Sequence, residues 1–168
     1  IWHLLRHNSR RGSRRNIEAH YDLGNDFYAL WLDRSMTYSA AWFGDGATSL
    51  ESAQQAKYDL VLDSLKLEPG HRLLEIGCGW GGLAEAAVAR GASVTGITLS
   101  HEQLAYARAR LKGQADLRLE DYRDTAGSFD RIASVEMIEA VGEEFWPTYF
   151  QTIDKLLELD FDTAIPGH

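Results

Sequence analysis

Apolar residues cluster in short runs along the middle of the chain, and amphipathic stretches separate these runs. Over 50–65 the apolar positions recur at helical spacing, which predicts a helix that Thr48 or Ser49 caps. Pro69-Gly70 ends this segment. A further short helical turn is predicted over 26–32, and Gly44-Asp45-Gly46 predicts a turn.

Four compact apolar runs predict buried strands, and each of the first three is followed by a turn or a helical pattern. The predicted strands are 72–76, 93–99, 117–120 and 129–135. The predicted helices are one that starts at Gly81 or Gly82 and runs to Ala89, then 100–111 and 143–157. Ser100 with Gln103 matches a capping box, and Pro147 fits a helix only in its first turn. Strands alternating with helices predict an α/β fold: a doubly wound, mostly parallel sheet covered on both faces. Its ligand should lie at the carboxyl ends of the strands, beside the first strand.

Charge is distributed unevenly along the 168 residues. The net charge is −8, yet residues 1–15 hold five arginines and no acid, so the remainder carries 12 basic against 25 acidic residues. We divide the chain into a basic arm or linker (1–15), an aromatic-rich helical segment (16–66), an incomplete α/β core (67–157) and an atypical tail (158–168). The arm is either a solvated linker or a peripheral contact to an anionic membrane; we expect no nucleic-acid partner.

The composition is that of one globular domain with a substantial core. No apolar run approaches the roughly 20 residues of a membrane span, and no leader pattern is visible. A single cysteine excludes an internal disulfide and a cysteine-cluster metal site, so no metal is expected. We predict a cytoplasmic location, with peripheral contact to the inner membrane through the arm.

The stretch LLEIGCGWGG, residues 73–82, places glycines directly behind an apolar run. Gly77, Gly79 and Gly82 fit G-x-G-x-x-G, which alone is weak evidence for a dinucleotide. A nicotinamide site needs an acid about 20 residues later for the ribose, and residues 97–99 contain none. The remaining structural explanation is a tight strand-to-helix turn without a ligand.

Acidic residues near this turn favour S-adenosylmethionine (SAM), which carries an ammonium group and no phosphate. Glu75 is placed to meet that ammonium or to organise the turn, and Glu120-Asp121-Tyr122 could contact adenine. Cys78 is interpreted as a small turn residue rather than a nucleophile, because no histidine lies nearby in sequence.

Five ordered motifs resemble the cyclopropane-fatty-acyl-phospholipid synthase family, which includes mycolic acid cyclopropane synthases and fatty-acid methyltransferases. They are HYDLGNDFYALWLD (20–33), MTYSAAWF (36–43), LLEIGCGWGG, GITLSHEQ (96–103) and SVEMIEAVGEEFWPTYF (134–150). The resemblance covers about residues 16–157. It implies a bacterial protein with the SAM-methyltransferase (Rossmann-like) fold. It implies methyl transfer to the cis double bond of an unsaturated phospholipid, followed by ring closure when a bound bicarbonate takes a proton.

Matched by motif, the resemblance assigns both a cofactor set and a catalytic residue. Glu139 is assigned to the bicarbonate. The aromatic residues of 21–43 could stabilise a developing cation or could be ordinary core. The residues assigned to SAM are Tyr38, Ser39, Leu73, Leu74, Glu75, Ile76, Gly77, Cys78, Gly79, Trp80, Gly81, Thr98, Leu99, Gln103, Tyr122 and Arg123.

The chain departs from the family pattern at two places. Ala40 stands where the family often has a cysteine near the bicarbonate, which leaves cyclopropane and methyl-branched products both open. After residue 157 the family's proline-glycine turn, fifth strand and lipid-binding portion have no counterpart, so we expect a truncated member whose C-terminal strands are missing. The alternatives are a methyltransferase for another lipid or small molecule, an inactive SAM-binding fragment and, last, a nicotinamide dehydrogenase.

Overall fold

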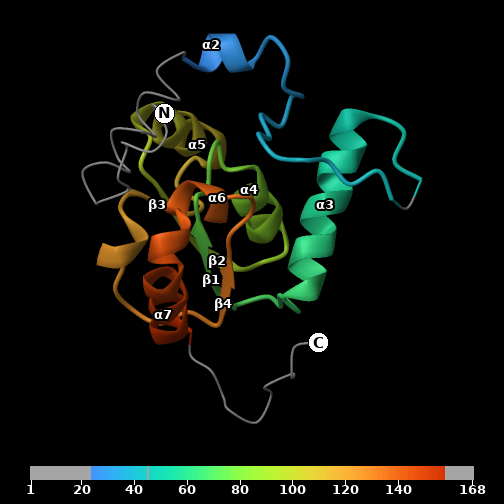
Figure 1. Cartoon of the computed structure of the whole chain (residues 1–168). Coiled ribbons are helices and arrows are strands. Elements are labelled where there is room, and N and C mark those ends of the chain that lie inside the picture. The colour runs from blue at the N-terminus through green and yellow to red at the C-terminus, as the bar shows by residue number, and fades with distance from the viewer. Residues whose placement is uncertain (1–23, 45, 158–168) are drawn as a thin grey trace.

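Four parallel strands form the centre of the molecule. The computed structural model describes residues 24–44 and 46–157. The strands are β1 (Arg72–Ile76), β2 (Ser93–Thr98), β3 (Asp116–Leu119) and β4 (Arg131–Ala133). Their order in the sheet is β3-β2-β1-β4, and every pairing is parallel (Figure 1). The chain therefore crosses from one side of β1 to the other after β3, which leaves a crevice beside β1 as expected.

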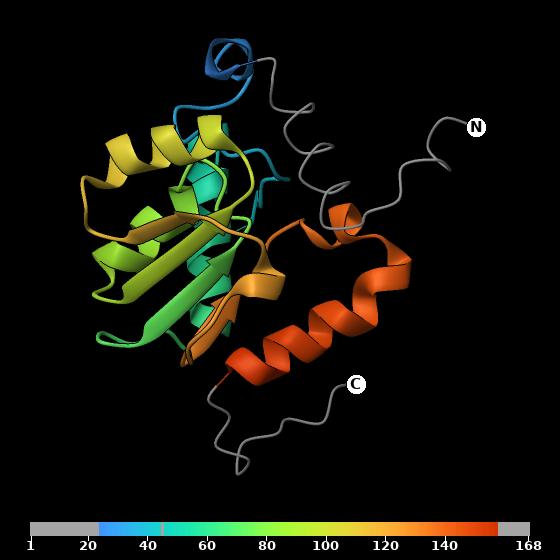
Figure 2. The ribbon, with the colours of Figure 1, turned by 90° about the vertical axis from the view of Figure 1, so that its left-hand side faces the viewer.

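Alternating side chains of β1 build a separate core on each face of the sheet. Leu73 packs against α3 (Leu50–Ser64), α4 (Gly82–Ala89) and α5 (His101–Leu111). Leu74 faces the opposite side, where α7 (Trp146–Leu156) covers the sheet. Figure 2 shows α7 on one side of the sheet and α4 and α5 on the other. Burial on both faces explains why β1 is apolar at successive positions rather than at alternate ones.

Helix ends follow the predicted chemistry with one change. Ser49, rather than Thr48, caps α3 and forms a reciprocal capping box with Ser52. Ser100 caps α5 by accepting the Gln103 backbone N–H at 3.2 Å. The Gln103 side chain does not complete the box, because its Oε1 accepts the Thr98 hydroxyl at 3.0 Å instead. Pro147 lies in the first turn of α7, as the sequence required.

Several elements differ from the prediction. The fourth strand is limited to three residues instead of spanning 129–135, and α2 (Asn25–Tyr28) is shorter than the predicted turn over 26–32. The short helices η2 (Tyr122–Asp124) and α6 (Ile138–Val141) were not predicted, and the helix predicted over 143–157 is divided into a third short helix, η3 (Glu143–Phe145), and α7. All three lie in the connections that surround the carboxyl ends of the strands. Within the described ranges, no helix is both long and apolar enough to cross a membrane.

Candidate functional site

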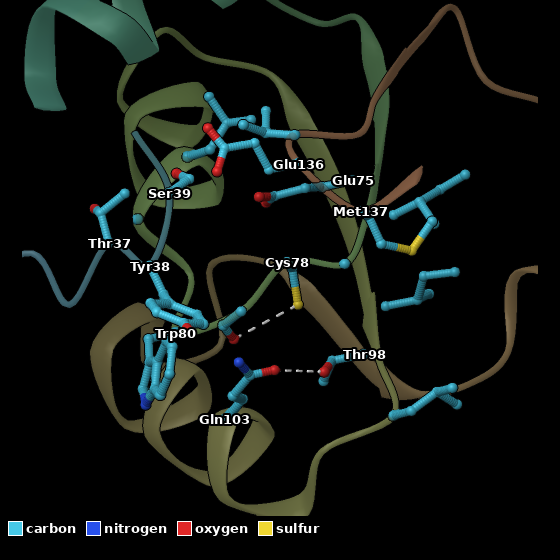
Figure 3. A pocket seen from close by; sticks show the side chains of 18 of the residues that line it. Thr37, Tyr38, Ser39, Glu75, Cys78, Trp80, Thr98, Gln103, Glu136 and Met137 are labelled. Atoms are coloured by element: carbon cyan, nitrogen blue, oxygen red, sulfur yellow. Dashed lines mark hydrogen bonds between the residues drawn. The ribbon is translucent and has the colours of Figure 1, made fainter. Parts of the chain in front are cut away.

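A cavity of about 190 Å³ opens at the carboxyl ends of the strands. Its floor is the glycine turn after β1, and its sides are the residues that follow β2, β3 and β4. The segment 36–39, which precedes α3, covers one side of it; Figure 3 shows Thr37, Tyr38 and Ser39 along that side. The position agrees with the site predicted at the carboxyl ends of the strands, beside the first strand.

The glycine turn redirects the chain from β1 into α4. Gly77 has φ +79°, a left-handed conformation that favours glycine. The backbone N–H groups of Gly77 and Cys78 both donate to the Ile97 carbonyl, at 2.9 and 3.0 Å, which ties the turn to β2. Gly82 lies against the Tyr58 hydroxyl, where a Cβ atom would collide with the ring. These glycines therefore let the backbone pack closely on both sides of the turn.

Glu75, near the end of β1, presents a buried carboxyl group to the cavity. Glu75 is 6% exposed, and its Oε2 has no hydrogen-bond partner among the described residues. Burial raises the pKa of Glu75 to about 8, an effect that a hydrogen bond from the Ala84 backbone only partly offsets. A ligand that brings a cationic donor to Oε2 would satisfy this group and favour its charged form.

The far side of the cavity adds further polar groups. Glu120 has an Oε1 that is buried without a partner among the described residues. Thr98 and Gln103 are both buried and hydrogen-bonded to each other on the cavity wall (Figure 3). In the part of the chain that the structure describes, no lysine or arginine lines the cavity. The lining instead carries three acids, Glu75, Glu120 and Glu136, of which Glu120 lies 3.7 Å from the Arg118 guanidinium outside the cavity. An acidic lining suits a ligand with an ammonium and neutral donors, and it disfavours a pyrophosphate.

One face of α3 holds the covering segment in place. Gln54 Nε2 donates to the Ser39 carbonyl at 2.9 Å, Lys57 Nζ donates to the Ser39 hydroxyl, and the Tyr58 and Thr37 hydroxyls are hydrogen-bonded. Burial lowers the pKa of Lys57, while the charge of Glu136 acts in the opposite direction. The position of Ser39 over the cavity is thus fixed by side chains from a helix that the cofactor motifs do not include.

Trp80 connects the glycine turn to the N-terminal segment. The ring is 3% exposed, packs on Tyr28 with centroids 5.2 Å apart and donates its Nε1 hydrogen to Asn25 Oδ1 at 2.6 Å. Figure 3 shows Trp80 beside Tyr38 at the edge of the cavity. Tyr28 and Trp80 are therefore core, whereas Phe27, Trp31 and Tyr38 remain about half exposed. Part of the predicted aromatic cluster is therefore ordinary core, and part remains open to contact a ligand.

Most residues assigned to SAM come together around this cavity. The lining includes Tyr38, Ser39, Glu75, Ile76, Gly77, Cys78, Gly79, Trp80, Thr98, Leu99, Gln103 and Tyr122. Leu73 and Leu74 lie instead in the two cores, and Gly81 packs against Ala107 of α5. Arg123 forms an ion pair with Asp121 at 2.5 Å rather than lining the cavity.

Two other predicted residues have different outcomes. Cys78 is 4% exposed, and burial raises the pKa of its thiol well above the ordinary value, which agrees with its interpretation as a small turn residue. Glu139 belongs to α6, but its side chain lies outside the described part of the structure, so its role stays a prediction. The basic arm also lies outside the described residues. No group of three or more metal-binding side chains occurs among those that are described.

Sequence reasoning missed several residues of the site. Met36, Tyr58, Glu136 and Met137 line the cavity, although none of them was assigned to the cofactor. Glu136 follows β4 and has φ +49°, an unusual conformation for a residue with a side chain. Its carboxylate Oε1 accepts the backbone N–H of Ala40 at 2.9 Å. The only sequence signal for Glu136 was a charged residue just after an apolar strand, and this signal did not predict the contact with Ala40.

Comparison with known proteins shows which family the chain is related to. The family model described as "Mycolic acid cyclopropane synthetase" matches residues 8–163. The chain belongs to this family. Members of the mycolic acid cyclopropane synthetase family are SAM-dependent methyltransferases that modify fatty acids or mycolic acids, so the family resemblance predicted from the motifs is confirmed.

Individual members of the mycolic acid cyclopropane synthetase family show how far the similarity extends. "Tuberculostearic acid methyltransferase UfaA1" of Mycobacterium tuberculosis is 45% identical over 94% of this chain and 40% of its own length. "Cyclopropane-fatty-acyl-phospholipid synthase" of Escherichia coli is 48% identical over 84% of this chain and 37% of its own. The chain thus spans about 40% of the length of the curated relatives it matches.

A solved structure confirms the fold. Mycolic acid cyclopropane synthase CmaA1, complexed with SAH and CTAB, aligns with a TM-score of 0.81 and 35% identity over 86% of this chain and 53% of that one. The predicted α/β fold with a parallel sheet is therefore confirmed, and the described strands are part of a larger fold.

Proposed function

We propose that this protein transfers the methyl group of SAM to the cis double bond of an unsaturated phospholipid acyl chain and forms a cyclopropane fatty acid. The observation that carries the proposal is the cavity beside β1, with the unpaired Oε2 of Glu75 facing a site that lacks a lysine or arginine among the described residues. The relationship to enzymes of fatty-acid modification supplies the substrate class.

The residues of the cavity fit SAM group by group. Glu75 would accept hydrogen bonds from the ammonium of the amino-acid portion. Glu120, with its unpaired Oε1, and the ring of Tyr122 would contact the adenosine portion. Thr98 and Gln103, already locked to each other, offer a preorganised polar wall. When bound, SAM supplies an electrophilic methyl group on a positively charged sulfur.

The chain's own side chains provide the dry environment that a weak alkene nucleophile needs. Ile76, Ile97, Val135 and Met137 line the cavity with apolar groups. Tyr38 covers its edge with an aromatic face that can stabilise positive charge. Excluding water from the site protects a cationic lipid from capture before it loses a proton.

The family resemblance also implies a bicarbonate, held by Glu139, as the proton acceptor. Ala40 occupies the position assigned to the neighbourhood of that anion, and its N–H is already donated to the Glu136 carboxylate. A second anion at this donor would be repelled by Glu136, and Glu75 is a further acidic group of the same cavity. The described residues therefore do not fit bicarbonate at Ala40, and we route no step through it.

A methyl-branched product is the second candidate. The relative named for tuberculostearic acid methylation matches 94% of this chain, more than the cyclopropane synthase of Escherichia coli does. Both products require the same methyl transfer. Proton loss with ring closure gives the cyclopropane, whereas proton loss with formation of a double bond gives an unsaturated branched chain, which becomes a saturated methyl branch only after a separate reduction.

One experiment tests both candidates. The purified protein is incubated with methyl-labelled SAM and vesicles of cis-unsaturated phospholipid, and the acyl chains are analysed by mass spectrometry and NMR. We expect label in a cyclopropane ring; label in a methyl or methylene branch would favour the second candidate. Saturated vesicles are the control and should take no label. SAM binding by calorimetry without any lipid product would identify an inactive SAM-binding fragment.

Membrane contact is a separate part of the proposal. We propose that the protein is cytoplasmic and that the basic arm of residues 1–15 brings it to the anionic surface of the inner membrane, where the acyl substrate is found. Sedimentation with anionic vesicles measures this contact. Replacing Arg10, Arg11, Arg14 and Arg15 by glutamine should weaken vesicle binding without changing the affinity for SAM.

A further inference from the structure

Glu136 occupies a backbone position that favours glycine. Its φ of +49° lies in the left-handed region, which costs free energy for a residue with a Cβ atom. Glycine would adopt the same conformation without that penalty. Non-glycine residues in such conformations occur preferentially at functional sites, so the side chain is the feature to explain.

The side chain of Glu136 reaches across the cavity to the covering segment. Its Oε1 accepts the Ala40 N–H at 2.9 Å, joining residues that are 96 positions apart. Figure 3 shows the carboxylate near Ser39 and on the same side of the cavity as Glu75. Glu136 lines the main cavity, yet the residue as a whole is exposed. One carboxylate therefore faces both the site of chemistry and the solvent.

Two neighbouring groups orient this carboxylate and balance its charge. The Ala40 N–H fixes one oxygen, and Lys57 is close enough for the charge of Glu136 to counter the effect of burial on the lysine. Glu75, another acid of this cavity, is 6% exposed, and Glu120 lies beside Arg118, so neither is as open to solvent as Glu136. A group that must take a proton and return it to solvent needs the environment of Glu136, not that of Glu75.

We propose that the Glu136 carboxylate is the general base that takes the proton from the methylated lipid cation, in place of an external anion. This inference rests on the proposed function. The alkene π electrons form the new bond to the methyl carbon as the carbon–sulfur bond breaks, and sulfur keeps that electron pair. A C–H bond of the cation then breaks. Its electrons close the ring, or form a double bond, and its proton forms the neutral carboxylic acid of Glu136, which releases it to water.

Two substitutions separate a proton acceptor from a structural clamp. Glu136→Gln keeps an oxygen that can accept the Ala40 N–H but cannot take the proton. Glu136→Gly suits the left-handed backbone and opens space for a small anion. Glu51→Gln, at an exposed position in α3 outside the cavity, is the matched control. A cooperative melting transition establishes that each variant is folded.

We expect Glu136→Gln to bind SAM in calorimetry within about threefold of the wild-type affinity, and to release SAH about 100-fold more slowly with unsaturated vesicles. Glu136→Gly should be similarly slow, and added formate or bicarbonate should accelerate it about tenfold. The wild type and Glu51→Gln should be fast and insensitive to both anions. Anion rescue is a response that a purely structural residue would not give.

Three results would overturn the inference. Wild-type turnover in either Glu136 variant without added anion would show that the carboxylate takes no proton. Loss of SAM affinity in parallel with turnover would show a clamp. Dependence of the wild type on bicarbonate would return the role to the external anion. A wild-type protein that binds SAM but labels no lipid refutes the proposed function itself and removes this inference with it.

Discussion

The buried carboxyl group of Glu75 links stability, pH and cofactor binding. Its pKa is raised from an ordinary value of 4.5 to about 8 because burial disfavours the carboxylate. At 1.36 kcal/mol per pKa unit, this displacement corresponds to about 5 kcal/mol between the two protonation states. Replacing the residue with glutamine, which has the same shape and no titration, should remove this dependence.

The direction of the effect follows from proton uptake. Between pH 4.5 and about 8 the unfolded chain has lost the proton of Glu75, whereas the folded protein retains it. The folded state binds more protons in this window, so the free energy of unfolding falls as pH rises. The contribution is fully present below pH 4.5 and is lost as pH rises through about 8. Glu75→Gln should flatten this slope.

Cofactor binding should reverse the protonation of Glu75. At pH 7 a group with a pKa of about 8 is roughly nine-tenths protonated. An ammonium brought to the unpaired Oε2 favours the carboxylate, so SAM binding should release close to one proton per site. Calorimetry in phosphate and in Tris, whose heats of protonation differ, measures that number directly.

The assay combines urea unfolding at pH 5.5, 7 and 8.5 with this calorimetry. Glu51→Gln, at an exposed position in α3, is the control and should keep the wild-type slope. Equal pH slopes in the wild type and Glu75→Gln, together with binding heats that do not depend on the buffer, would refute the reasoning. Either the carboxyl would then be solvated, or the ammonium would bind elsewhere.

Two further substitutions test the packing that positions the site. Gly82→Ala should destabilise the protein by about 1–3 kcal/mol in urea unfolding, because the added methyl group collides with the Tyr58 hydroxyl. Adding Tyr58→Phe should restore part of this loss. If the unfolding free-energy changes of the two substitutions were strictly additive, the collision would be contradicted. Asp130→Asn should cost about 1 kcal/mol at pH 7, because Asp130 pairs with the Arg72 guanidinium at 2.8 Å on a partly exposed surface. Arg72 lowers the pKa of Asp130, so this stabilisation is fully present above pH 3.8 and is lost progressively as pH falls from there through the lowered folded-state pKa. An unfolding difference that is absent at pH 7, or that does not shrink as pH falls below 3.8, would contradict this account.

The sequence alone determined the features that depend on neighbouring residues. The strand at 72–76 was placed to the residue and the start of the next helix to within one residue, because an apolar run and a glycine turn impose local conformations. Ser100 was identified as a helix cap for the same reason. The alternation of strands and helices predicted a parallel sheet, and a parallel sheet places its ligand cavity at the carboxyl ends of the strands, where the cavity lies.

Only the tertiary structure decided which distant side chains complete the cavity. The contact of Glu136 with Ala40 spans 96 residues, and the pairing of Thr98 with Gln103 displaced a local capping bond. Such contacts depend on the relative placement of whole elements, which no local pattern encodes. The same placement buried Glu75 and left its Oε2 without a hydrogen-bond partner among the described residues. Burial raised the pKa of this carboxyl into the neutral range. Burial and long-range pairing are collective properties of the packed chain, so they become visible only when the fold is complete.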